Sequence, residues 1–351
     1  MSRAVWLEGL GLEGFPVAAL AAYGVLRLLV EEEGMGEVRL VFRNPFSRPV
    51  PGLLGVEERE LLLRLARRLR RTPPLPQQLL DQKKKLEDLL EEMQGLAAAD
   101  PRTRIFLPAL LLPRPGGKAF LSPLDTSKGQ QRLTEALRKN WEAARRIHLL
   151  KGLRQVLFAD SPRTGVLLER GVELQIWSRK KGKWESVKFG LVGWHPSQYR
   201  QWAEGAREPN ELEFKEKVRI HPVATLLAWE AVPLFFLYPG QDGIRAAGIH
   251  DPEGSPRLLL PTPGYPVSLR ALKALLLQAP LALQNPRAWP PEVALWRSDR
   301  LGHPKKTNEP YPVYFEAQPA LCGPQAGTQT PGGRAGGVRS SRTAFSDLGE
   351  I

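Results

Sequence analysis

The sequence predicts an α+β protein with a helix-rich N-terminal half, a more β-rich C-terminal half and an antiparallel β-hairpin. Amphipathic helical periodicity dominates residues 1–150. A clean two-residue alternation over 172–178 precedes a Lys-Lys-Gly turn, which is typical of a hairpin. Strand and helix patterns do not alternate regularly enough to build a parallel sheet. Together these observations favour a mixed α+β class.

The length of 351 residues predicts roughly two domains. We expect an N-terminal α+β and helical region over 1–150 and a hairpin-containing α+β region over 151–321. Beyond Cys322 the composition turns to Gly, Ser, Thr, Gln and Arg with few apolar residues. Such a segment buries too little surface to order itself, so 322–351 is predicted to be a disordered tail.

The net charge of +13 is the strongest compositional observation. A basic excess of this size favours polyanionic partners, nucleic acid first, although a bias that only aids solubility is the alternative. The single cysteine, Cys322, excludes a disulfide framework and favours a reducing cytoplasm. No apolar run reaches the roughly 18 residues that span a bilayer, so no membrane association is expected.

Two strands are predicted over 3–8 and 37–42, and a helix is predicted between them over 16–33. A Pro- and Gly-rich stretch ends this unit near Gly55. An amphipathic helix follows over 57–71, with leucines at helical spacing on its apolar face. A second helix is expected over 77–96.

Residues 104–112 are apolar but contain Pro108, so they are predicted to form an edge strand at best. A capping box at Ser127–Gln130 predicts a helix that reaches about Leu150. The hairpin joins 172–178 to 184–192.

Two further helices are predicted in the C-terminal half. A strongly apolar segment over 221–237 is expected to form a buried helix that runs into a strand after Pro233. Another helix is expected over 267–277, begun by Ser268.

Gly9, Gly11 and Gly14 match the G-x-G-x-x-G pattern between a strand and a helix, which would begin a dinucleotide site. Pro16 follows almost at once, Glu8 adds negative charge beside a pyrophosphate, and no βαβ alternation completes the sheet. We therefore interpret these glycines as turn and packing residues. A dinucleotide-dependent oxidoreductase is a minor alternative, and no cofactor is expected.

No catalytic motif stands out in the sequence. The P-loop, H-E-x-x-H and G-x-S-x-G patterns are all missing. The five histidines are scattered, three of them directly before proline, so no metal site is predicted. The protein is therefore expected not to be an enzyme. The alternative is a metal-dependent nuclease with dispersed carboxylates, whose convergence a sequence cannot reveal.

Basic and aromatic residues meet at the tip of the predicted hairpin. Cations can neutralise phosphates while an aromatic ring stacks on a base, and both are needed at a nucleic-acid contact. The alternative is a solvated turn whose lysines protect a strand edge. The candidate binding residues here are Trp177, Arg179, Lys180, Lys181, Lys183 and Trp184.

Further candidates lie on the helix over 57–71 and before the helix that ends near Leu150. A solvated helix face is the alternative for both, and cations near a helix C-terminus are favoured by the helix dipole anyway. These candidates are Arg64, Arg67, Arg68, Arg71 and Lys128.

Two apolar segments resemble a known family. Residues 15–29 read Phe-Pro-Val-Ala-Ala-Leu-Ala-Ala-Tyr-Gly-Val-Leu-Arg-Leu-Leu, and 221–235 read His-Pro-Val-Ala-Thr-Leu-Leu-Ala-Trp-Glu-Ala-Val-Pro-Leu-Phe. Both resemble segments of the large subunits of type I CRISPR effector complexes, those of the I-G group (formerly I-U) most of all. The resemblance touches about a quarter of the chain.

The resemblance implies a non-catalytic subunit of an RNA-guided antiviral complex. Its partners would be a guide RNA, a DNA target with a short flanking motif, the other effector subunits and a separate nuclease-helicase. It brings no catalytic residue to carry over to this sequence.

Overall fold

The computed structural model describes residues 3–11, 16–80, 86–110, 112–113, 119–120, 133–146, 149–158, 172–178, 181–190, 219–220, 222–240, 243–250, 257–299 and 318–321. These residues combine helices with mainly antiparallel sheets, so the predicted α+β class is confirmed. The predicted tail over 322–351 lies outside the described residues. Within the described ranges, no helix is long and apolar enough to cross a membrane.

Three short antiparallel strands form the N-terminal sheet, in the order β1 (Val5–Trp6), β3 (Val50–Leu54) and β2 (Arg39–Arg43). β1 and β2 confirm the strands predicted over 3–8 and 37–42. The central strand β3 was missed, because Pro51 and Gly52 are typical of turns. Gly52 has a packing reason here, since a Cβ would lie 2.6 Å from the Trp6 ring.

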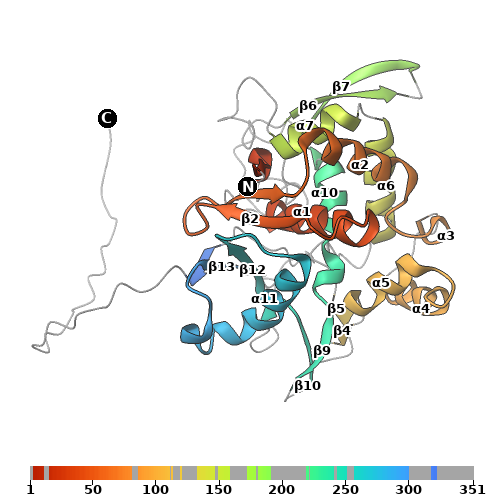
Figure 1. Ribbon diagram of the computed structural model, residues 1–351. Helices are drawn as coiled ribbons and strands as arrows, with labels where there is room; N and C mark the ends of the chain where they lie inside the picture. The colour runs from red at the N-terminus through yellow and green to blue at the C-terminus, as the bar shows by residue number, and fades with distance from the viewer. Residues whose placement is uncertain are drawn as a thin grey trace, which may run out of the picture.

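The centre of the molecule is a pair of helices from distant parts of the sequence, α1 (Pro16–Arg27) and α10 (Pro222–Trp229) (Figure 1). All residues of both helices are buried. The predictions of a helix beginning at residue 16 and of a buried helix within 221–237 are confirmed. The two backbones are in close contact at Gly24, where a Cβ would lie 1.9 Å from the carbonyl oxygen of Leu227. Glycine is therefore required at this crossing.

A layer of helices packs beside this pair: α2 (Glu58–Arg71), α6 (Leu133–Arg146) and α7 (Leu149–Phe158) (Figure 1). The helix predicted over 57–71 is confirmed, and its apolar face is buried as the spacing predicts. Trp141 of α6 donates a hydrogen bond from Nε1 to the carbonyl of Leu69, 3.3 Å away. α7 was missed because the sequence favoured a single helix up to about Leu150, and the predicted capping box lies outside the described residues.

The prediction for residues 104–112 was wrong, because α5 (Pro101–Leu110) is a helix that contains Pro108. Asp100 caps it, with Oδ2 accepting the backbone N–H of Thr103 at 2.5 Å, and proline is favoured at the first helical position. Pro108 falls in the last turn, where its missing N–H costs one helical hydrogen bond. Burial of Phe106 offsets that loss.

The region around α5 also contains short elements: α3 (Gln77–Leu80), α4 (Leu86–Leu96), β4 (Leu112–Pro113) and β5 (Ala119–Phe120). α3 and α4 both fall within the single helix that was predicted over 77–96. β4 and β5 form an antiparallel pair.

The C-terminal half contains an antiparallel sheet in the order β11 (Ile249–His250), β12 (Arg257–Pro263), β13 (Val293–Asp299) and β14 (Gln318–Leu321). Helix α11 (Leu269–Ala282) packs on β12 (Figure 1). A bridge between Leu40 and Val267, with N···O distances of 2.9 and 2.8 Å, ties this unit to β2. The sequence predicted α11 but not this sheet.

A short 3₁₀ turn (Val232–Leu234) links α10 to the two-stranded sheet of β9 (Leu237–Gly240) and β10 (Gly243–Ala246). The strand predicted directly after Pro233 begins later than expected, at Leu237, because residues 232–234 form the 3₁₀ turn. The division into domains at 150/151 stays a prediction, although one contiguous core cluster includes residues from both sides of it.

Ser268 begins α11 as predicted, because its Oγ accepts the backbone N–H of Ala271 at 3.1 Å. Ser268→Ala is expected to lower the free energy of unfolding by about 1 kcal/mol, the usual value of such a cap. Urea unfolding measures this, and Ser268→Asn should retain most of the stability. An asparagine variant as unstable as the alanine variant would show that the cap is not the source.

Candidate nucleic-acid interface

The predicted hairpin is confirmed as β6 (Val172–Ser178) and β7 (Lys183–Gly190), with the short β8 (Arg219–Ile220) parallel to β7. The register makes Trp177 and Trp184 direct cross-strand partners. Gly182 has a φ of +59°, the left-handed conformation that tight hairpin turns require. The local sequence pattern therefore determined both the turn and the register.

The structure describes two of the hairpin lysines. Lys181 lies in the turn and Lys183 begins β7, and both are exposed. The other basic candidates, Arg179, Lys180 and Lys128, lie outside the described residues.

The four arginines predicted on α2 fall into two different environments. Arg64 contacts Glu60 at 2.7 Å and Glu33 at 3.1 Å. Arg68 forms an ion pair with Glu32, and only 17% of its side chain is exposed. These two arginines therefore bind acids of the same chain.

The other two arginines, Arg67 and Arg71, are exposed, and among the described residues neither forms a hydrogen bond or an ion pair. The spacing on α2 predicted a common arginine face. In the structure, Glu32 and Glu33, which follow α1, bind Arg68 and Arg64 respectively. The four arginines therefore do not share one environment.

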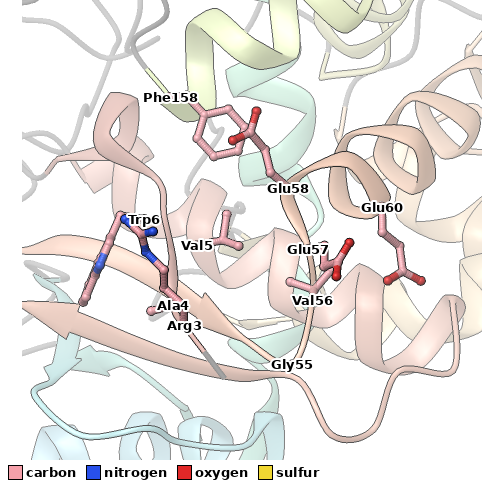
Figure 2. A pocket seen from close by; sticks show the side chains of 10 residues that line it. All are labelled: Arg3, Ala4, Val5, Trp6, Gly55, Val56, Glu57, Glu58, Glu60 and Phe158. Atoms are coloured by element: carbon pink, nitrogen blue, oxygen red, sulfur yellow. The ribbon is translucent and has the colours of Figure 1, made fainter. Parts of the chain in front are cut away.

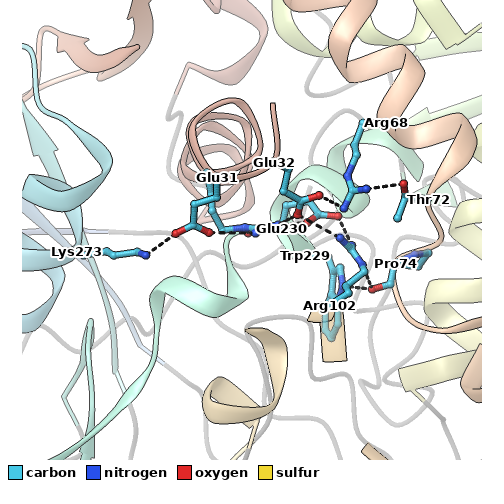
Figure 3. A network of polar contacts seen from close by, with 10 residues as sticks. Glu31, Glu32, Arg68, Thr72, Pro74, Arg102, Trp229, Glu230 and Lys273 are labelled. Atoms are coloured by element: carbon cyan, nitrogen blue, oxygen red, sulfur yellow. Dashed lines mark hydrogen bonds and ion pairs between the residues drawn. The ribbon is translucent and has the colours of Figure 1, made fainter. Parts of the chain in front are cut away.

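A charge network lies beneath α2 and joins side chains from distant segments (Figure 3). We use this name for Arg27, Glu31, Glu32, Arg68, Arg102, Glu230 and Lys273. Its members come from α1, the turn after α1, α2, α5, the end of α10 and α11. The network therefore connects the two central helices to three other helices.

Arg27 is the fully buried centre of the network. Its Nε donates to the carbonyl of Glu230 at 2.5 Å and its Nη2 pairs with the Glu230 carboxylate. It also contacts Glu32 at 2.9 Å and Glu31 at 3.3 Å. Two consecutive glutamates reach one arginine because α1 continues into a π-helical turn (Leu28–Glu32), whose wider winding places residues i+4 and i+5 near residue i.

Arg102 of α5 completes the network. Its Nη2 lies 2.5 Å from Glu230 Oε1, and its Nε donates to the carbonyl of Pro74 at 3.0 Å. Trp229 Nε1 donates to the same carbonyl, also at 3.0 Å. Side-chain contacts thus hold α5 against the end of α10.

An aromatic pair forms the apolar side of the network. The rings of Phe106 and Trp229 stack with centroids 4.8 Å apart and an interplanar angle of 12°. The guanidinium carbons of Arg27 and Arg102 lie 5.6 and 5.0 Å from the Phe106 centroid, within cation–π range. Packing and charge therefore stabilise the same junction.

Burial and charge act in opposite directions on Glu230. Burial opposes ionisation of its carboxyl, but the charges of Arg102 and Arg27 outweigh burial and hold its pKa below the ordinary value. Burial lowers the pKa of Arg68 to about 10, so this guanidinium is still charged at neutral pH. The network contains four basic and three acidic side chains, and this near balance of charge suits a structural junction.

Sequence reasoning did not identify Arg27 and Glu230 as partners. A usable signal existed, since each is a charged residue within a segment predicted to be buried. A charge buried in an apolar segment must be paired. Their pairing still required knowledge that α1 and α10 are neighbours.

The glycine stretch after β1 forms a 3₁₀ turn (Glu8–Leu10), and β1 is antiparallel to β3. A dinucleotide fold would instead start from a parallel strand. Arg43, the last residue of β2, contacts the carboxylate of Glu8 at 2.8 and 2.9 Å. Gly14 lies outside the described residues.

A pocket of about 820 Å³ lies beside β1 (Figure 2). Trp6 and Phe158 contribute aromatic walls, and three carboxylates come from α2 and the residue before it. Carboxylates repel phosphate, so this pocket is unsuited to a nucleotide. Neither Gly9 nor Gly11 lines it. The lining residues are Arg3, Ala4, Val5, Trp6, Gly55, Val56, Glu57, Glu58, Glu60 and Phe158.

Among the residues that the structure describes, no group of three or more His, Cys, Asp or Glu is placed to hold a metal ion. Comparisons with protein-family models, curated proteins and solved structures find no significant match for the chain.

Proposed function

We propose that this protein is a non-catalytic, nucleic-acid-binding subunit of an RNA-guided complex, of the kind found as the large subunit of type I-G CRISPR effectors. Its partners would be a guide RNA, target DNA, the other effector subunits and a separate nuclease-helicase. It would act in the cytoplasm, where these partners assemble.

The observation that carries the proposal is the packing of the two segments on which the resemblance rests. Residues 15–29 and 221–235 are far apart in sequence, yet their helices α1 and α10 pack together at Gly24. A buried ion pair between Arg27 and Glu230 joins their ends. Two coincidental matches would have no reason to meet in this way, so the packing favours one structural unit.

The charge of the chain supports a nucleic-acid partner. The net charge is +13, and the acids near the charge network are bound to arginines that are largely buried. The exposed arginines of α2 that have no partner among the described residues therefore carry a larger share of the uncompensated charge. A basic surface of this kind binds phosphate backbones.

Co-purification tests the proposal directly. The tagged full-length chain, expressed with a CRISPR array and effector subunits from the same locus, is expected to co-purify with guide RNA and with those subunits. The protein alone should not cleave DNA or RNA in the presence of Mg²⁺ or Mn²⁺. Recovery of the chain without RNA or protein partners, or metal-dependent cleavage lost on removing the metal, would contradict the proposal.

The hairpin provides a more local prediction. Lys181→Glu combined with Lys183→Glu is expected to weaken binding to RNA or DNA and to reduce the slope of log K against log salt by about two, one for each lost phosphate contact. Fluorescence anisotropy over a salt series measures both effects. Arg270→Glu with Arg287→Glu is the matched control, because it changes the net charge equally at two exposed arginines. Equal affinity of the hairpin variant and the wild type at every salt concentration would remove the hairpin from the interface.

A further inference from the structure

Helix α2 contains six arginines in 14 residues. Arg64 and Arg68 bind acids of the same chain, as described above. The others are exposed, together with Leu63, whose exposed fraction is 47%. We call this surface the α2 outer face, formed by Arg59, Leu63, Arg67, Arg70 and Arg71.

The positive charge of the α2 outer face is not compensated within the part of the chain that the structure describes. None of its four arginines forms a hydrogen bond or an ion pair there. The two acids of the helix are already engaged, because Glu58 binds Arg154 at 2.5 Å and Glu60 binds Arg64 at 2.7 Å. The face therefore offers free guanidinium groups to an external anion.

Helix stability does not explain all of these arginines. Cations are favoured in the last turn of a helix, which accounts for Arg70 and Arg71. Arg59 lies in the first turn, where the helix dipole disfavours a cation, and Arg67 precedes the last turn. Their presence points to a role outside the helix.

The spacing of the face suits an extended polyanion. Positions 59, 63, 67 and 71 recur every four residues and so follow one side of the helix. At 1.5 Å per residue, Arg59 and Arg71 are about 18 Å apart along the axis. Along the duplex axis, the phosphates of one strand of B-DNA advance about 3.4 Å per nucleotide, so the row is long enough to reach more than one phosphate. A single small anion would need only one of these positions.

The residue type also favours phosphate. All four cations are arginines, whose planar guanidinium binds phosphate oxygens through two parallel hydrogen bonds. Leu63 lies in the same row and offers apolar contact to a sugar or a base. Carboxylates of an acidic protein could pair with the same arginines, so the test below includes an acidic polymer.

We propose that the α2 outer face binds the phosphate backbone of RNA or DNA, as a site separate from the hairpin. This inference rests on the proposed nucleic-acid-binding function and adds a second contact surface to it. Arg64 and Arg68 are outside the site, because the acids of the same chain hold them.

The test compares Arg67→Glu with Arg71→Glu against the control Arg270→Glu with Arg287→Glu in the full-length chain. The probes are a labelled single-stranded RNA and a labelled DNA duplex, measured by fluorescence anisotropy over a salt series. The α2 variant is expected to bind at least about tenfold more weakly at low salt, with a salt slope smaller by about two. The control should differ from the wild type by no more than about threefold. The probe that loses more affinity identifies the natural strand type.

Acidic residues near a helix C-terminus are unfavourable, so Arg67→Gln with Arg71→Gln is tested beside the Glu variant, and thermal melting confirms that both are folded. Wild-type affinity in the folded α2 variants would overturn this inference while leaving the proposed function intact. Failure of the wild type to bind either probe at low salt would overturn the proposed function itself. Equal binding of poly-glutamate and oligonucleotide, both lost in the α2 variants, would assign the face to acidic proteins and overturn the inference.

Discussion

Alanine at position 24 is expected to lower the free energy of unfolding by about 3 kcal/mol or more, at the upper end of the range for overpacking. A Cβ at Gly24 would lie 1.9 Å from the carbonyl oxygen of Leu227 and 3.1 Å from the amide nitrogen of Ala231. Both are backbone atoms, so no side-chain rotation can relieve the overlap. The two central helices would have to move apart, which would also weaken the ion pair between Arg27 and Glu230.

Denaturant unfolding of the wild type, Gly24→Ala and a matched control measures this effect. The control is Gly95→Ala in α4, because a Cβ there meets nothing within 4 Å. Alanine is the better helix former, so the control is expected to be unchanged or stabilised by up to about 1 kcal/mol. If the two alanine variants unfold at the same denaturant concentration, the backbones of α1 and α10 are not in contact at Gly24.

Glutamine at position 230 is expected to lower the free energy of unfolding by about 3–5 kcal/mol, the cost of removing one partner from a buried ion pair. Glu230 is 4% exposed and is shared by Arg27 and Arg102. Glutamine preserves the shape but removes the charge, which leaves two guanidinium groups with less compensation. The contacts of α5 with α10 should loosen as a result.

Glu142→Gln is the matched control, because its partner Arg138 forms an ordinary i,i+4 pair with side chains 29% and 35% exposed. Pairs of this kind contribute about 0.3–0.5 kcal/mol. Thermal or urea unfolding of both variants provides the comparison. A Glu230 variant no less stable than the Glu142 variant would mean that the buried network contributes nothing net.

Glu230 also predicts a pH dependence. Its pKa in the folded protein lies below the ordinary value of 4.5. The unfolded chain therefore takes up the proton first as the pH falls, so the stabilisation by Glu230 is present above pH 4.5 and is lost below it. The difference in unfolding free energy between the wild type and Glu230→Gln should shrink on acidification below that pH. A constant difference from pH 7 to the acid limit would contradict an ionised Glu230.

Local patterns predicted α2, α11 and the hairpin well. The leucine spacing of α2 specifies a helical period, and the two-residue alternation of the hairpin specifies a strand period. Both periods are visible within a few consecutive residues. Ser268 was a reliable start signal for the same reason, because a cap bonds within its own turn. These elements needed no information from distant parts of the chain.

Elements that depend on contacts with residues far away in the sequence were missed or predicted wrongly. β3 contains Pro51 and Gly52, which are unfavourable in isolation, but the Trp6 ring requires the space that Gly52 leaves. α5 contains Pro108, yet the stacking of Phe106 on Trp229 stabilises it as a helix. In both, tertiary contacts outweigh local propensity.

The candidate site divides in the same way. The sequence showed that α2 is rich in arginine and that the hairpin tip is basic, because charge and periodicity are written in consecutive residues. It could not show which arginines are free, since Glu32 and Glu33 reach α2 from the turn after α1.

By itself, then, the sequence determined the α+β class, the hairpin, the arginine-rich helix and two buried apolar segments, because each follows from short-range periodicity and composition. Only the tertiary structure decided that the two apolar segments cross at Gly24, that Arg27 and Glu230 neutralise each other, and that one face of α2 keeps its arginines free. A buried charge is tolerated only beside an opposite charge, and an exposed one remains available only where no acid can reach it. Both conditions depend on which segments meet in space.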